Sequence, residues 1–175
     1  MFRFSTCRLR VNEVKILSTT FKRTECGRRP VRTTNKMSQP ITRVFDLLDQ
    51  SLAKYNKSDV FASKIKGEWQ RISAKDFIDS VTQLSLGLLK IGVEKGDKIA
   101  VISESRPEWN IVDFAVQQVG AIGVPLYPNI TVDDYRYIFN DASIKLVFVG
   151  DADLLKKAQA AAQDTPSVQE IYSFD

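Results

Sequence analysis

Few residues of this chain belong to the types that carry out nucleophilic or acid–base chemistry. There is no histidine among the 175 residues, and the two cysteines, Cys7 and Cys26, both lie near the N-terminus. A Ser-His-Asp or Cys-His site therefore cannot be built, and no set of residues has the spacing of a metal site. We predict no catalytic residue and no metal ligand in this chain.

The eight glycines do not form the common nucleotide-binding patterns either. No GxGxxG is present, which argues against a dinucleotide site. Gly87 and Gly92 have the spacing of a phosphate loop, but Val93 follows where that loop requires Lys. Gly87 also falls within a predicted helix.

One generic site remains, beyond the carboxyl ends of predicted parallel strands, where ligands of open sheets settle near helix N-termini. Residues 103–106 (SESR) follow one predicted strand, Tyr127 follows the next, and residues 150–151 follow the third. The residues that we expect to bind substrate at this edge are Ser103, Arg106, Trp109 and Tyr127.

Two of these candidates also have a purely structural interpretation. Arg106 has the charge to hold an anionic group, and Trp109 has the surface to line an apolar slot. Alternatively, Arg106 pairs with Glu104 or Glu108 at the surface while Trp109 fills the core.

The elements that must position these residues follow from hydrophobic periodicity and turn residues. In chain order the pattern predicts a helix (41–55), a hairpin of two strands (60–64 and 68–72), a helix (73–91), a strand (99–102), a helix (107–119), a strand (123–127), a helix (131–141), a strand (145–149), a helix (151–162) and a strand (168–174).

Helix starts are marked by capping residues. Ser73 stands three residues before Asp76, and Thr131 stands three before Asp134, the spacing at which two side chains satisfy helix N-terminal amides. Pro107 suits the first turn of a helix. By contrast, Pro125 and Pro128 are expected near strand ends or on a bulge, because proline cannot donate to a ladder.

Alternation of strand and helix implies parallel strands joined by right-handed crossovers. The predicted fold class is α/β: a partial open parallel sheet with helices on both faces, plus a small N-terminal β-hairpin. Since the sheet stops at its fourth strand without a closing element, we expect it to be part of a larger sheet. Its exposed edge would then favour aggregation or docking.

Positive charge is concentrated near the N-terminus. Residues 1–36 carry ten Lys or Arg against two Glu, a net charge of +8, whereas residues 37–175 carry 15 basic and 19 acidic groups, a net of −4. This arginine-rich leader has the composition of a mitochondrial transit peptide, or else Met37 is the true start. We expect residues 1–36 to be disordered or loosely helical and residues 37–175 to form the domain.

The sequence predicts neither nucleic-acid binding nor a membrane-spanning helix. No repeating aromatic and basic pattern of the kind that stacks nucleic-acid bases is present. No run of 18 apolar residues exists, so we expect no transmembrane segment.

The stretch GDKIAVISESRPEW, residues 96–109, continues as NIVDFAVQQVGAIGVPLYPNITVDDYRYIFNDASIKLVFVGD to residue 151. Together with GEWQRISAKDF at residues 67–77 and QEIYSFD at residues 169–175, it resembles the N-terminal region of AMP-forming long-chain acyl-CoA synthetases, members of the adenylate-forming ligase superfamily. The similarity runs from about Met37 to Asp175.

The resemblance implies a two-step ligase. With ATP and Mg²⁺ a fatty acid would form an acyl-adenylate, and coenzyme A would then displace AMP. In the family, charge around the phosphates is stabilised by three features: a Ser/Thr/Gly-rich phosphate loop ending in Lys, an acidic motif that helps to hold metal, and a catalytic Lys of the C-terminal domain. None of the three has a counterpart in this sequence, so the resemblance assigns no catalytic residue to this chain.

We therefore expect an N-terminal fragment of an AMP-binding domain that is inactive alone, because the C-terminal part of the same enzyme is missing. Its location would be the cytoplasm or the periphery of a membrane, or mitochondria if residues 1–36 are a transit peptide. The alternative is a standalone, non-catalytic α/β domain that binds a fatty acid or a nucleotide.

Overall fold

The structure is a computed structural model that describes residues 41–65 and 67–175. The predictions for residues 1–36, Met37 and both cysteines lie outside these residues. The strands are β1 (Phe61–Ile65), β2 (Glu68–Ile72), β3 (Lys98–Ile102), β4 (Ile122–Leu126), β5 (Leu146–Val149) and β6 (Glu170–Ser173). The helices are α1 (Asp46–Lys54), α2 (Ala74–Lys90), α3 (Pro107–Gln118), α4 (Val132–Asp141) and α5 (Ala152–Ala162).

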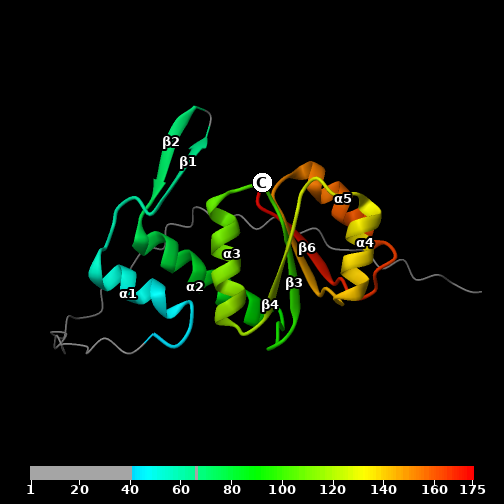
Figure 1. Cartoon of the computed structure of the whole chain (residues 1–175), viewed down its shortest axis with the longest axis horizontal. Coiled ribbons are helices and arrows are strands. Elements are labelled where there is room, and N and C mark those ends of the chain that lie inside the picture. The colour runs from blue at the N-terminus through cyan, green and yellow to red at the C-terminus, as the bar shows by residue number, and fades with distance from the viewer. Residues whose placement is uncertain (1–40, 66) are drawn as a thin grey trace, which may run out of the picture.

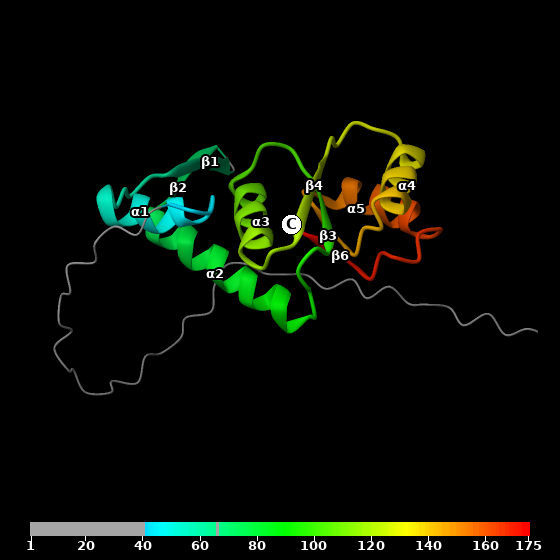
Figure 2. The ribbon, with the colours of Figure 1, turned by 60° about the horizontal axis from the view of Figure 1, so that its bottom comes forward.

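A four-stranded parallel sheet lies between two layers of helices (Figures 1 and 2). Helices α2 and α3 cover one face, and α4 and α5 cover the other. Strand β3 is buried between them: Ile99 and Val101 belong to the first core, and Ala100 and Ile102 to the second. A strand buried on both faces reads as a continuous apolar run. The predicted α/β class is confirmed.

The strand order β4-β3-β5-β6 contains a reversal. The chain moves from β3 outward to β4, and then returns past β3 to form β5. Helix α3 follows β3 on one face, whereas α5 follows β5 on the other face. The loops after β3 and β5 therefore leave the sheet in opposite directions. Such a switch point is where open α/β sheets bind ligands.

The predicted capping residues begin the helices as expected. Thr131 Oγ1 accepts from the Asp134 amide at 3.2 Å, and the Asp134 carboxylate accepts from the Thr131 amide at 3.0 Å. Ser73 Oγ likewise accepts from the Asp76 amide at 3.1 Å, but the Asp76 carboxylate accepts only from the Ser73 hydroxyl, at 2.7 Å. The second capping pair therefore satisfies one backbone amide and not two.

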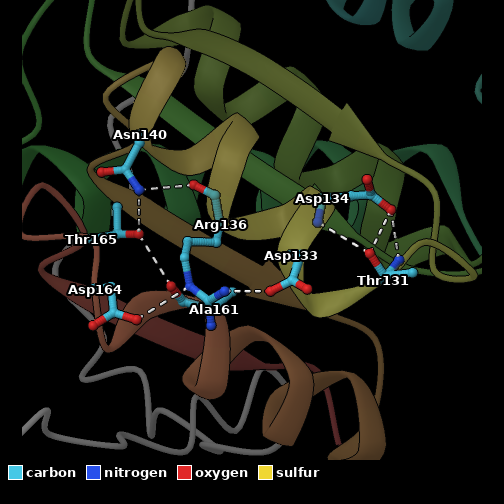
Figure 3. Close-up of polar contacts among 8 residues, drawn as sticks. All are labelled: Thr131, Asp133, Asp134, Arg136, Asn140, Ala161, Asp164 and Thr165. Atoms are coloured by element: carbon cyan, nitrogen blue, oxygen red, sulfur yellow. Dashed lines mark hydrogen bonds and ion pairs between the residues drawn. The ribbon is translucent and has the colours of Figure 1, made fainter.

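Helix α4 is tied to the turn after α5 by the polar cluster in Figure 3. Asn140 Nδ2 donates to Thr165 Oγ1 at 3.2 Å, and this hydroxyl donates to the Ala161 carbonyl at 3.1 Å. Arg136 forms ion pairs with Asp133 and, at 3.3 Å, with Asp164. Because Thr165 is almost fully buried, its hydroxyl needs these partners, which fix the second helical layer.

Some boundaries differ from the prediction. The first helix begins at Asp46 and not at Ile41, because the Asp46 carboxylate accepts from the amides of Thr42 and Arg43 and turns the chain there. Pro125, by contrast, lies near a strand end as expected: it is the penultimate residue of β4, opposite Val101. A residue without an N–H is tolerated there because β4 is an edge strand with a neighbour on one side.

Candidate substrate-binding cleft

The loop after β3 brings three predicted site residues to the switch point. Strand β3 ends at the buried Ile102, and Pro107 occupies the first turn of α3. The four intervening residues form a short connection that bends at Glu104 and Ser105 and becomes extended at Arg106, whose φ is −137° and ψ is 152°. Proline has a fixed φ suited to the first helical turn, so the loop can be no longer than this.

Arg106 joins this loop to two segments that are distant in sequence. Its Nη1 donates to the Gly150 carbonyl at 2.6 Å and to Asp175 Oδ1 at 2.9 Å, and its Nε donates to Glu108 at 3.3 Å. The guanidinium also lies 5.7 Å from the ring centroid of Phe174. We refer to this set of contacts as the Arg106 clasp.

These contacts keep the guanidinium of Arg106 protonated. Burial of the guanidinium lowers its pKa, but the hydrogen bonds and charges of Asp175 and Glu108 outweigh burial and leave the pKa above its ordinary value. The same carboxylates neutralise the cation. An anionic group that binds Arg106 would therefore compete with Asp175 and Glu108 for its charge.

Gly150 allows the loops after β3 and β5 to approach closely. A Cβ atom at this position would lie 2.6 Å from Ser103 Oγ and 3.2 Å from Ser103 Cα. No side chain fits such a gap without moving the backbone. The sequence marked Gly150 only as the end of a strand, because its partner Ser103 is 47 positions away and no local pattern links them.

A cleft of about 460 Å³ opens beside the clasp. Its residues come from the hairpin and from the loop and helix after β3: Phe61, Ala62, Ser103, Glu104, Ser105, Arg106, Pro107, Trp109 and Asn110. This volume is within the range of small-molecule sites. The cleft combines aromatic side chains with hydroxyl, amide and charged groups. The contribution of the hairpin was not foreseen from the sequence, since Phe61 precedes the loop by about 40 residues.

The structure brings together Ser103, Arg106 and Trp109, all of which line the cleft. Tyr127 does not join them: its side chain is 78% exposed, and its carbonyl accepts from the Tyr135 hydroxyl at 2.8 Å. Trp109 is half-buried and packs against the first core while it lines the cleft, so both interpretations of this residue apply in part.

The chemistry that this arrangement can perform is binding and orientation. Across the described residues, no three His, Cys, Asp or Glu side chains form a cluster that could hold a metal ion. The carboxylate of Asp151, next to Gly150, accepts from the amides of Asp153 and Leu154 and caps α5. In the part of the chain that the structure describes, no helix is long and apolar enough to cross a membrane.

The fold is that of adenylate-forming enzymes. Residues 48–175 match the family described as AMP-binding enzyme, and the chain belongs to this family. The match extends over every element of the sheet.

Curated relatives specify the branch. Long-chain-fatty-acid--CoA ligase FadD15 of Mycobacterium tuberculosis is 26% identical over 112 residues, which cover 64% of this chain and 19% of the relative. Long chain acyl-CoA synthetase 6, peroxisomal, of Arabidopsis thaliana is 28% identical over 118 residues, which cover 67% of this chain and 17% of the relative. The resemblance to long-chain acyl-CoA synthetases is confirmed. The chain spans about a fifth of the length of these relatives.

Solved structures agree on the fold. A Mycobacterium tuberculosis fatty acyl CoA synthetase aligns with a TM-score of 0.64 at 18% identity, covering 75% of this chain and 26% of that one. The A-PCP didomain of carboxylic acid reductase from Segniliparus rugosus, in complex with AMP, aligns with a TM-score of 0.68 at 20% identity, covering 78% and 22%.

Proposed function

We propose that these residues are the N-terminal part of an ATP-dependent long-chain fatty-acid–CoA ligase, which converts a fatty acid, ATP and coenzyme A to acyl-CoA, AMP and pyrophosphate. The single observation that supports this most is the family match over residues 48–175, together with relatives named as long-chain ligases. Mg²⁺ and coenzyme A would act in the whole enzyme, on residues outside this chain.

The cleft is proposed to receive the acyl part of the substrate. Phe61 and Trp109 offer apolar surface on two of its sides, whereas the charge of Arg106 is already matched by two carboxylates. An aliphatic chain gains by covering apolar surface. A phosphate would instead have to compete with Asp175 for Arg106. Tyr127 would contribute only if the whole enzyme brings another segment next to it.

The 175 residues are proposed to be inactive by themselves, because none of the phosphate-stabilising motifs of the family occurs in them. The test is to incubate the purified chain with palmitate, ATP, Mg²⁺ and coenzyme A, and to measure AMP and acyl-CoA. We expect neither product. Acyl-CoA formation, in a preparation free of contaminating ligase, would contradict this part of the proposal.

The alternative is a standalone domain that binds a fatty acid or a nucleotide without turnover. It is favoured by one observation: the hairpin and the loop and helix after β3 form a cleft of about 460 Å³, a volume within the range of small-molecule sites. Reading the transcript beyond the codon of Asp175 separates the two functions. Continuation into a Ser/Thr/Gly-rich loop that ends in Gly-Lys supports the ligase, and an immediate stop codon supports the standalone domain.

The proposed location is the cytoplasm or the periphery of a membrane, with mitochondria as the alternative if residues 1–36 are a transit peptide. Fusion of these residues to a fluorescent reporter tests the alternative. Mitochondrial fluorescence would support a transit peptide, and diffuse fluorescence would exclude it.

A further inference from the structure

The hairpin β1–β2 has two faces of different character. In its antiparallel register Lys64 lies opposite Trp69, and Ala62 lies opposite Arg71. Directly opposed residues share a face, and successive residues along a strand point to opposite faces. Phe61 therefore lies on the second face, where its ring is 4.8 Å from the ring of Phe77. We call the side with Ala62, Lys64, Trp69 and Arg71 the outer face of the hairpin; towards its base, Ala62 also lines the cleft.

Trp69 is left in solvent on this outer face. Its side chain is 67% exposed, and it makes no aromatic or cation–π contact with the residues in ranges 41–65 and 67–175. The hairpin points away from the sheet and helices in Figure 1, so its free end can approach a flat surface. An indole ring is amphipathic and is most stable where an apolar layer meets water, as at the headgroup level of a bilayer.

The charges beside Trp69 are positive. Lys64 is exposed and has no ion pair among the described residues, while Arg71 is 3.6 Å from Asp59, both being exposed. Such a surface pair contributes little and leaves Arg71 available. Residues 57–72 carry four basic and two acidic residues, although residues 37–175 as a whole are net negative. The outer face therefore places two basic side chains, those of Lys64 and Arg71, beside an exposed indole.

A second exposed aromatic residue provides an internal comparison. Tyr137 on α4 is 70% exposed, but the hollow that it lines also contains two acidic residues, Asp133 and Asp141, against one basic residue, Arg136, which is paired with Asp133. Its surroundings therefore offer no excess of positive charge to an anionic surface. Exposure of an aromatic ring is thus common to both sites, and of these two only the hairpin adds a basic side chain, Lys64, that has no ion pair among the described residues.

We propose that the outer face of the hairpin docks the protein onto a bilayer that contains anionic lipids. Trp69 enters the headgroup region, and Lys64 and Arg71 contact lipid phosphates. A specific protein partner would need about 800 Å² of surface on each side, far more than one face of two five-residue strands provides. A bilayer requires no such complementary area, because binding comes from the interfacial indole and from attraction to anionic headgroups.

The test is sedimentation of the full 175-residue chain with two kinds of vesicle, one of phosphatidylcholine and one of phosphatidylcholine mixed with phosphatidylglycerol. We expect binding to the anionic vesicles that weakens as salt is added. Trp69→Ala should lower the partition coefficient by about tenfold, the effect of removing one large buried side chain. Tyr137→Ala is the matched control and should leave it unchanged.

The basic residues 1–36 could bind vesicles by themselves, so a charge-matched control is required. Lys64→Gln with Arg71→Gln should weaken partition about 25-fold, since each basic residue near the membrane surface contributes about fivefold. Lys156→Gln with Lys157→Gln removes the same charge from α5, on the other face of the sheet, and should have little effect on partition. Equal loss in both double variants would assign binding to overall charge and overturn the proposal.

Fluorescence places the indole directly. In a Trp109→Phe variant Trp69 is the remaining tryptophan, and its emission should shift to shorter wavelength with anionic vesicles. An unshifted spectrum, or equal binding to both kinds of vesicle, would overturn the proposal. So would a protein that is dimeric in ultracentrifugation and becomes monomeric on Trp69→Ala, with partition unchanged, because the outer face would then be a protein interface.

Discussion

The loop after β3 and the hairpin β1–β2 form opposite sides of the cleft, and they are held by different means. The loop is fixed at three points by the Arg106 clasp and lies against Gly150 without room for a Cβ atom. The hairpin is fixed at its base, where the ring of Phe61 lies 4.8 Å from that of Phe77 on α2. Its free end has only exposed side chains from Glu68 to Arg71.

This difference indicates that one side of the cleft is rigid and the other adjustable. Backbone regions with few buried contacts open locally at low free energy, whereas tightly packed loops open only with the whole domain. A substrate that enters the cleft would meet a fixed surface at Ser103 and Trp109 and a movable one at Ala62. Substitutions should therefore destabilise the protein strongly on the first side and weakly on the second.

The largest expected effect is at the contact between the two loops. Gly150→Val places a side chain on Ser103 and should lower the free energy of unfolding by about 1–3 kcal/mol, the usual cost of overpacking. Gly87→Ala is the control, because no atom lies within 4 Å of its added Cβ; it should raise stability by about 0.5–1 kcal/mol. Urea unfolding measures both. An unchanged midpoint for Gly150→Val would mean that the loops do not touch.

The second largest loss of stability is expected when the Arg106 clasp is removed. Arg106→Met keeps the aliphatic stem but removes the hydrogen bonds to the Gly150 carbonyl, Asp175 and Glu108. We expect a loss of about 1–2 kcal/mol, since the group is partly exposed and solvent screens its ion pairs. Lys156→Met breaks an exposed pair with Asp153 and should cost less in the same urea titration. Equal losses would show that the clasp adds nothing beyond a surface ion pair.

A smaller effect is expected where the turn before β3 meets β5. The Asp97 carboxylate accepts from the Glu94 amide at 2.7 Å and from Lys145 Nζ at 2.6 Å, and these contacts lower its pKa. Because the folded pKa is below the unfolded value of about 3.9, the stabilisation is complete above that value and is lost as pH falls through the folded pKa. Asp97→Asn should cost about 1 kcal/mol at pH 7.

The pH dependence supplies the check on that pair. The difference in unfolding free energy between the wild type and Asp97→Asn should shrink as the pH is lowered from 5 towards about 3. A difference that is constant over this range would assign the cost to packing and not to the charge of Asp97.

The smallest change in stability is expected in the hairpin, the adjustable side of the cleft. Trp69→Ala should change the free energy of unfolding by no more than about 0.5 kcal/mol, because the ring is exposed and has few neighbours to lose. Hydrogen exchange adds a second readout: amides of β2 should exchange much faster than those of β3 and β5. Protection of β2 equal to that of β3 would remove the distinction between the two sides.

Local features of this fold were predictable from the sequence, and distant contacts were not. Ser73 and Thr131 begin helices through bonds to residues three positions on, and Pro107 does so through its own fixed φ, so residue types and spacing were sufficient. Of the two expected partners of Arg106, Glu108 forms the pair and Glu104 does not. The longer contacts, to Gly150 and Asp175, depend on how the strands are ordered in the sheet, which no local pattern records.

The central claim is that the cleft between the rigid loop and the hairpin receives the substrate. In a Trp69→Phe chain the emission of Trp109 reports on the cleft alone, and titration with palmitate below its micellar concentration should change it saturably. Ala62→Phe, which fills the cleft from the hairpin side, should abolish that change while the protein stays folded by circular dichroism. A flat titration, or a change of the same size in the Ala62→Phe variant, would contradict the account.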